Sequence, residues 1–234
     1  MKLLFENWRK YLNEGIDPRI QKQIDMLLAL PDVAIRLKRD WGSEAFLISY
    51  VRTGEGAPKS LTQKDSTVWN PKNKKLTKTG YPHGYVQLFR DQGDTGPCLD
   101  SWIIYNTMAE GGWGPLLYEV AIEWASQNGG GLASDRAIVS GDAQAVWSKY
   151  AARSGVGRKQ MDISYDVHGT TIDGKDVEEY PQLTPDIPED DCDQSKAIDD
   201  YGVKWHESPV SRMYFKGTPE VITALKEAGR WVEG

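Results

Sequence analysis

A glycine-rich turn is the stretch of this sequence best suited to chemistry. Its residues are Gly111, Gly112, Trp113, Gly114 and Pro115. They follow an apolar, strand-like run at residues 102–105 and precede an amphipathic helical pattern at residues 116–127. A strand that delivers a glycine-rich loop to a helix N-terminus leaves backbone N–H groups free, and the helix dipole favours negative charge there. The turn therefore either holds a phosphate group or only joins a strand to a helix.

Histidines and acidic residues are the other side chains with ligand chemistry. The three histidines lie in separate segments without the spacing of metal ligands, so we expect surface or packing roles for His83, His168 and His206. An acidic run lacks the glycine-turn spacing of an EF-hand. It comprises Asp186, Glu189, Asp190, Asp191 and Asp193. We expect a solvated acidic loop and no metal site.

The composition excludes two broad classes of protein. The 234 residues include 39% hydrophobic and 26% charged residues, which fits a globular chain of one large domain or one domain with an appendage. No apolar run is long enough to cross a bilayer, so we expect no membrane partner. The net charge of -6 argues against a general nucleic-acid binder, because neutralising phosphates requires a basic face.

The two cysteines predict no covalent framework. Cys98 and Cys192 are far apart and neither belongs to a Cys-x-x-Cys pair. A disulfide framework or a structural zinc site is therefore not expected. We expect two reduced thiols, as in proteins of the cytosol.

The first half of the chain predicts a helix followed by strands. Asp17 suits an N-cap and Pro18 the first helical position, with the helix continuing to about Leu30. Alternating apolar residues predict strands at 33–38 and 85–90. The apolar, β-rich residues 45–51 predict a more buried strand that forms a hairpin with the first, and a further strand is expected at 99–106. The polar residues 53–84 predict a long surface loop, whose lysines either attract an anionic partner or are merely solvated.

The second half predicts helices separated by short strands. A helix at 116–127 is expected to end in left-handed residues at 128–131, because glycine tolerates that conformation. Further elements are a strand at 131–134, a helix at 143–153 capped by Ser140 or Asp142, and a closing strand at 159–164. After an acidic, irregular stretch, a last helix is expected at 220–230 with Thr218 as its cap.

This order of elements predicts a mixed α/β (α+β) fold rather than an alternating doubly wound chain. With Gly112-Trp113-Gly114 preceding PLLYEVAIEWA, residues 33–164 resemble the GNAT superfamily of acyl-CoA N-acyltransferases. The resemblance implies a central, mostly antiparallel sheet with flanking helices. We accordingly divide the chain into an amphipathic segment at 1–14, a GNAT-like domain at 15–165, and an acidic linker with a C-terminal helical extension at 166–234.

The same resemblance implies a co-substrate and its contacts. Acetyl-CoA would donate the acyl group to an amine acceptor that the sequence does not identify, and no metal would take part. In this family the glycine loop cradles the coenzyme A pyrophosphate, which assigns cofactor binding to Gly111, Gly112, Trp113, Gly114 and Pro115. Backbone at Asn106 and Met108 would polarise the thioester carbonyl.

Three side chains are candidates for proton transfer in such a reaction. Tyr150 would protonate the leaving thiolate, or else occupies a core or rim position. Glu110 and Asp135 are carboxylates that would serve as bases for the amine. Asp135 also suits a structural ion pair with the adjacent Arg136.

A narrower resemblance is to acetyltransferase-like proteins of tailed bacteriophages, carried by GPLLYEVAIEWA, LASDRAIVS, VWSKYAAR and SPVSRMYFK. Residues 1–14 are similar to phage head-targeting peptides, cleaved after sequences such as Leu12-Asn13-Glu14, although an ordinary docked helix also fits. Ala109 replaces the Gln or Arg that begins the family loop motif. Two functions therefore stay open: an acetyl-CoA-dependent N-acyltransferase, or a catalytically degenerate virion or protein-interaction module. The implied location is the host cytoplasm or the phage head, with head proteins as partners in the latter.

Overall fold

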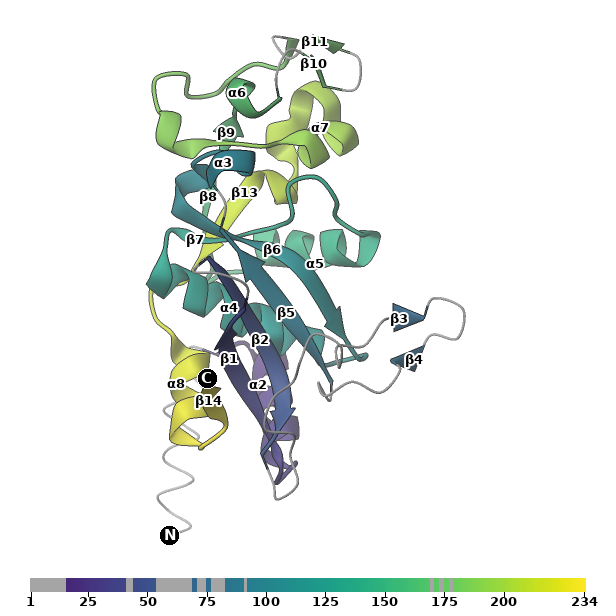
Figure 1. The fold of residues 1–234 in the computed structure, drawn as a ribbon, viewed down its shortest axis with the longest axis vertical. Coiled ribbons are helices and arrows are strands. Elements are labelled where there is room, and N and C mark those ends of the chain that lie inside the picture. Colours follow the sequence, from purple (N-terminus) through teal and green to yellow (C-terminus); the bar gives the residue numbers. More distant parts are fainter. Residues whose placement is uncertain are drawn as a thin grey trace. The chain divides into compact units, whose positions relative to one another are not determined.

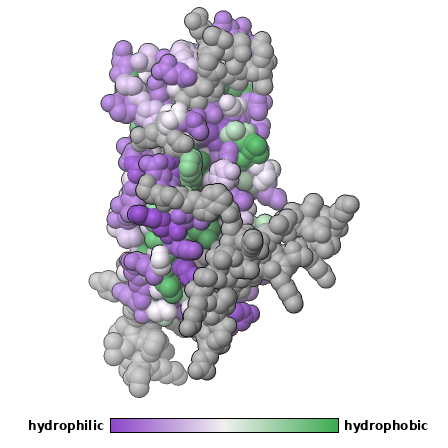
Figure 2. Space-filling model, viewed as in Figure 1, coloured by the Kyte–Doolittle hydropathy of each residue, from purple (hydrophilic) through white to green (hydrophobic). Residues whose placement is uncertain are grey.

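The computed structural model describes residues 16–40, 44–53, 69–70, 75–76, 83–90, 92–168, 171–172, 175–176 and 179–234. The head-targeting segment expected at 1–14 and most of the surface loop expected at 53–84 lie outside these residues. Among the described helices, none is both long and apolar enough to cross a membrane. Figure 2 shows one face of the molecule, on which the coloured residues are largely hydrophilic and the hydrophobic ones form separate small patches.

An eight-stranded sheet with flanking helices is the principal element (Figure 1). Its strand order is β14-β1-β2-β5-β6-β7-β13-β8. The strands are β1 (Val33–Arg39), β2 (Ala45–Arg52), β5 (Gly84–Phe89), β6 (Ser101–Ala109), β7 (Gly131–Ala133), β8 (Gly157–Gln160), β13 (Arg212–Phe215) and β14 (Trp231–Glu233). The β1–β14 and β6–β7 pairs are parallel, whereas β1–β2, β7–β13 and β8–β13 are antiparallel. The predicted mixed α/β class with a mostly antiparallel central sheet is confirmed.

The remaining elements are helices and two-residue strands. The α-helices are α2 (Pro18–Leu28), α3 (Gln92–Thr95), α4 (Gly114–Asn128), α5 (Gly141–Ala152), α6 (Tyr165–His168), α7 (Ser195–Tyr201) and α8 (Glu220–Glu227). The 3-10 helices are η2 (Cys98–Asp100), η4 (Pro188–Asp190), η5 (Gly202–Glu207) and η6 (Pro209–Ser211). Three small ladders pair β3 (Trp69–Asn70) with β4 (Lys75–Leu76), β9 (Asp162–Ile163) with β12 (Asp191–Cys192), and β10 (Thr171–Ile172) with β11 (Lys175–Asp176).

The chain divides into two compact units, which we describe separately. Unit 1 comprises residues 1–87, 106–121 and 219–234, and unit 2 comprises residues 88–105 and 122–218. The strands β5 and β6 and the helix α4 each contribute residues to both units.

Unit 1 contains the predicted N-terminal helix and hairpin. The Asp17 carboxylate accepts the Arg19 N–H at 2.8 Å, and α2 buries Ile20, Ile24 and Leu27. The predicted β1–β2 hairpin is present and runs from Val33 opposite Arg52 to Arg39 opposite Phe46.

Residues beyond 166 supply strands as well as helices. β14 pairs in parallel with β1 in unit 1, and β13 lies between β7 and β8 in unit 2. The sequence predicted only an acidic linker and a helical extension for residues 166–234. The last predicted helix is present as α8, but its N-cap is Pro219 without a side-chain hydrogen bond, so the predicted Thr218 cap is wrong. By contrast, Ser140 caps α5 by accepting the Ala143 N–H at 3.3 Å.

The closing strand predicted at 159–164 is two strands. β8 ends at Gln160 and pairs with β13, whereas β9 begins at Asp162 and pairs with β12. Between them, the N–H of Met161 donates to the carbonyl of Ser211 at 3.2 Å. The carboxylate of Asp162 then accepts backbone N–H groups from residues 183 and 184, which draws the chain away from the main sheet.

A left-handed turn in unit 2 precedes β6. The three residues of η2 have φ values of 46°, 56° and 61°. Left-handed conformations cost non-glycine residues roughly 1–2 kcal/mol each. The carbonyl of Asp100 accepts the Gly130 N–H at 2.8 Å, which holds this turn against the end of α4.

The glycine tract after α4 accommodates this turn. A Cβ atom at Gly130 would collide with the carbonyl oxygen of Leu99, and one at Gly129 would lie 2.7 Å from that of Asp100. Among residues 129–131, only Gly131 has a positive φ. The prediction of left-handed residues is therefore wrong for Asn128, Gly129 and Gly130, and at the two glycines the requirement is close packing of backbone.

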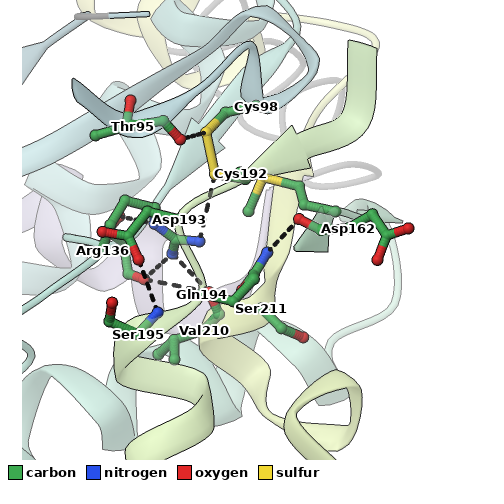
Figure 3. Close-up of a disulfide and its surroundings, with 12 residues drawn as sticks. Thr95, Cys98, Arg136, Asp162, Cys192, Asp193, Gln194, Ser195, Val210 and Ser211 are labelled. Atoms are coloured by element: carbon green, nitrogen blue, oxygen red, sulfur yellow. Dashed lines mark hydrogen bonds between the residues drawn. A yellow bond between two sulfur atoms is a disulfide. The ribbon is translucent and has the colours of Figure 1, made fainter. Parts of the chain in front are cut away.

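The two cysteines form a disulfide, so the prediction of reduced thiols is wrong. Cys98 of η2 and Cys192 of β12 are joined across 94 residues of sequence, and both are fully buried (Figure 3). Their neighbours include Ile103, Met161 and Met213. The 94-residue separation of the two cysteines did not indicate a disulfide, because their pairing depends on how residues 186–195 pack against η2.

Replacing Cys192 by Ala should lower the free energy of unfolding by about 2–4 kcal/mol, because the disulfide restricts the unfolded chain. Urea denaturation with and without reductant measures this change. Reductant should destabilise the native protein by a similar amount and leave Cys192→Ala unaffected. Two titratable thiols in the denatured, unreduced protein would contradict the disulfide.

Candidate functional site

The predicted glycine turn lies in unit 1, between β6 and α4. The N–H of Glu110 donates to the carbonyl of His83 at 3.1 Å, and that of Trp113 donates to the carbonyl of Glu110 at 3.0 Å. Gly111 and Gly112 are exposed, and the described residues provide no acceptor for their N–H groups. No atom lies within 4 Å of a Cβ built at either glycine. A side chain at either position would therefore meet open space, and both exposed backbone donors lack an acceptor among the described residues.

The beginning of α4 is already capped from within unit 1. The side-chain oxygen of Gln23 in α2 accepts the Leu116 N–H at 2.6 Å. Pro115 has no N–H to offer. An anion at this helix N-terminus would therefore depend on the donors of Gly111 and Gly112 more than on the first turn of the helix.

Trp113 anchors the turn to the core of unit 1. Its side chain is buried, and its carbonyl accepts the Tyr50 hydroxyl at 2.9 Å. The two rings meet edge to face with centroids 5.2 Å apart. Burial raises the pKa of Tyr50 far above its usual value, so the hydroxyl remains a donor. Trp113 thus fixes where the neighbouring glycines lie.

A histidine–carboxylate pair adjoins the turn. His83 Nδ1 lies 2.9 Å from Glu110 Oε2, and the imidazole stacks on the Trp113 ring with centroids 4.1 Å apart. His83 has a φ of 80°, an unusual conformation of the kind that clusters at functional sites. The described residues provide no partner for Nε2. A carboxylate that orients an imidazole leaves the second ring nitrogen able to accept or donate a proton.

The sequence indicated Glu110 as a candidate base but predicted only a surface or packing role for His83. The two residues are 27 positions apart, so no spacing rule connects them. The pair exists because β5 and β6 are neighbours in the sheet.

The last residues of β6 extend past its pairing with β7. The β6–β7 register runs from Ser101 opposite Gly131 to Ile103 opposite Ala133, whereas β6 continues to Ala109. In unit 1, Asn106 is exposed and its side-chain amide donates to the Tyr85 hydroxyl at 3.2 Å. Met108 is half-buried on the same strand. This part of β6 offers backbone groups that the described β7 does not pair.

The other two candidates, Tyr150 and Asp135, belong to unit 2. Tyr150 is buried with Trp147 and Tyr214, at ring-centroid distances of 6.4 Å and 6.5 Å. Arg153 lies over the Tyr150 ring at 5.7 Å. This is the setting of a core or rim tyrosine, the alternative that the sequence left open.

Asp135 and Arg136 have separate partners. Asp135 Oδ1 accepts the N–H groups of Ala137 and Ile138 at 2.9 Å and 2.7 Å, which stabilises the turn before α5. Arg136 is buried and donates to the carbonyls of Ser134 and Val210 at 3.0 Å and 2.6 Å (Figure 3). Burial lowers the pKa of Arg136 to about 10. Both residues have structural partners that account for their positions.

Comparison of the chain with protein-family models, with curated proteins and with solved structures gives no match in any of the three.

Tyr50→Phe should lower the free energy of unfolding by about 1–2 kcal/mol, since it removes a buried hydrogen bond to the Trp113 carbonyl. Thermal or urea unfolding measures the change. Tyr105→Phe is the matched control: this tyrosine is 65% exposed, and its replacement should alter stability by less than about 0.5 kcal/mol. Equal effects of the two variants would show that the Tyr50 hydroxyl does not anchor the turn.

Proposed function

We propose that this protein is an acyl-CoA-dependent N-acyltransferase with a GNAT-like fold. The observation that carries the proposal is the succession of β6, an open glycine turn, α4 and a β7 strand parallel to β6. Ligands of α/β sheets bind beyond the carboxyl ends of such strands. These elements belong to, or lie beside, a mostly antiparallel sheet, which agrees with the resemblance of the sequence to the GNAT superfamily.

The diphosphate of coenzyme A is the anion that we assign to the turn. The N–H groups of Gly111 and Gly112 have no acceptor among the described residues, and the dipole of the 15-residue α4 favours negative charge beside them. Gly112 has a φ of 91°, which a branched side chain adopts only with strain. The rest of the cofactor would extend along the part of β6 beyond its pairing with β7, where backbone at Asn106 and Met108 would polarise the thioester carbonyl.

His83 and Glu110 supply the base in this proposal. Glu110 orients the imidazole, and His83 Nε2 accepts the proton of the attacking amine. The amine nitrogen then forms a bond to the acyl carbon, the carbon–sulfur bond breaks, and the thiolate takes up a proton. Tyr150 and Asp135 belong to unit 2, so the proposed proton transfer in unit 1 relies on His83 and Glu110 in their place.

Gly112→Val should weaken coenzyme A binding at least roughly tenfold, because a branched residue at positive φ rearranges the turn and its donors. Isothermal titration of the full chain with coenzyme A and acetyl-CoA measures the affinity. Gly155→Val is the matched control, because Gly155 has a similar φ of 79°, equally open surroundings and a position in unit 2. Absence of binding to the native protein at millimolar ligand would overturn the proposal.

His83→Gln and Glu110→Gln should each lower the rate of acetyl transfer by about 10²–10⁴-fold while leaving coenzyme A affinity unchanged. Thiol release from acetyl-CoA, measured with a panel of polyamines, amino sugars and peptide amines, gives the rate. His206→Gln is the control, because His206 lies in unit 2 beside Trp205. Binding of coenzyme A without transfer to any amine would instead favour the non-catalytic module, which the alanine at position 109 also suits.

A further inference from the structure

Three aspartates of unit 2 meet at a short parallel ladder. Asp162 of β9 lies opposite Asp191 of β12, and Asp190 ends η4 immediately before that strand. One carboxylate oxygen from each residue lies within 4.8 Å of the other two. Like charges placed opposite one another on neighbouring strands are destabilising. The arrangement therefore needs a source of positive charge.

Asp162 is held firmly by the segment that follows Tyr180. Its carboxylate accepts the N–H groups of Ile163, Leu183 and Thr184, at distances between 2.6 and 2.9 Å. The Thr184 hydroxyl lies within hydrogen-bond distance of Asp162 Oδ2 at 3.1 Å and Asp190 Oδ2 at 2.9 Å. Because a carboxylate has only about four lone-pair positions, these donors use most of the capacity of Asp162. Asp162 thus contributes mainly charge.

Asp190 carries an oxygen that nothing in the described chain satisfies. Its side chain is 8% exposed, and Oδ1 is buried without a hydrogen-bond partner. Within the described residues, Asp162, Asp190 and Asp191 form no ion pair with a lysine, arginine or histidine. Buried carboxylates are normally hydrogen-bonded, paired with a cation or bound to a metal ion. The orphaned oxygen is thus a second sign, besides the clustering, that a ligand belongs here.

The electrostatics of the cluster agree with this shortage of positive charge. Burial and the carboxylates of Asp162, Asp190 and Asp166 raise the pKa of Asp191 to about 6. Burial also raises the pKa of Asp190. Asp190 is buried and Asp191 half-buried, whereas Asp186 and Glu189 are exposed, so the expectation of a solvated acidic loop is wrong at Asp190.

We propose that the cluster of Asp162, Asp190 and Asp191 binds a calcium ion. Asp190 and Asp191 offer carboxylate oxygens, which hard divalent cations prefer, and Asp162 contributes mainly its negative charge. The adjacent Cys192 is held in the disulfide and offers no thiolate for a softer metal. Mg²⁺ demands near-octahedral geometry, whereas Ca²⁺ accepts six to eight oxygens in irregular arrangements. Ligands from the 3-10 turn η4 and the short strand β12 form such an irregular set, which water would complete.

A calcium ion here would join β9, η4 and β12. The segment at 179–195 has little regular secondary structure, and its described attachments include the disulfide and the donors to Asp162. An ion that binds only the folded chain stabilises it by mass action.

Calcium titration of the full, metal-stripped chain tests the proposal. We expect one Ca²⁺ to bind with a dissociation constant of about 10⁻⁵–10⁻³ M and to raise the unfolding temperature. Asp190→Asn and Asp191→Asn should each weaken binding at least roughly tenfold, because ligand charge sets calcium affinity. Glu189→Gln is the matched control, since it removes one charge from an exposed position of the same η4 turn and should leave binding unchanged.

Several results would overturn the proposal. These are no heat of binding with millimolar CaCl₂, an undiminished calcium response in both Asn variants, or a response to MgCl₂ as large as that to CaCl₂. Stabilisation at pH 5 without any response to calcium would show that protons, not a metal, neutralise the cluster. If Asp190→Asn fails to fold by circular dichroism, the half-buried Asp191→Asn decides the test.

Discussion

The left-handed turn at residues 98–100 is the constraint on which unit 2 depends. Three consecutive non-glycine residues in this conformation cost roughly 3–6 kcal/mol together, at 1–2 kcal/mol each. The disulfide, which joins residues 94 positions apart, contributes about 2–4 kcal/mol, a similar magnitude. The hydrogen bond from the Gly130 N–H to the Asp100 carbonyl also stabilises the turn against this conformational cost. The turn is thus maintained by a covalent link and by glycines that allow backbone to approach backbone.

Both candidate sites are connected to this turn through the chain. On one side, the turn fixes where β6 begins, so that Ser101 lies opposite Gly131 and only three residues pair with β7. β6 then continues to Ala109 and to the glycine turn. On the other side, Cys192 follows Asp191 directly and shares the β9–β12 ladder with it. The Cys98–Cys192 disulfide therefore lies next to the start of β6, which leads to the proposed coenzyme site, and within β12, which carries a proposed calcium ligand.

The sequence predicted the elements whose signals are local. The Asp17–Pro18 start of α2, the β1–β2 alternation and the Ser140 cap of α5 all depend on residues within a few positions. Features that depend on distant segments were missed. These include the disulfide, the pairing of β14 with β1 and the His83–Glu110 contact, whose partners meet only after the sheet has formed. The glycine turn was located correctly, but Trp113 as its buried anchor depends on Tyr50, 63 residues away.

The features that break local rules are more informative about function than the motif that obeys them. A glycine turn before a helix is conformationally favourable whether or not it binds a ligand. Its presence alone therefore does not distinguish a binding loop from a simple connection. His83 at a positive φ beside Glu110, and Asp190 with an oxygen that the described chain leaves unsatisfied, each cost stability where they stand. Natural sequences tolerate such costs mainly at sites that bind or react. The imidazole–carboxylate pair and the aspartate cluster are accordingly stronger grounds for chemistry than the Gly-Gly-Trp-Gly-Pro stretch that first suggested it.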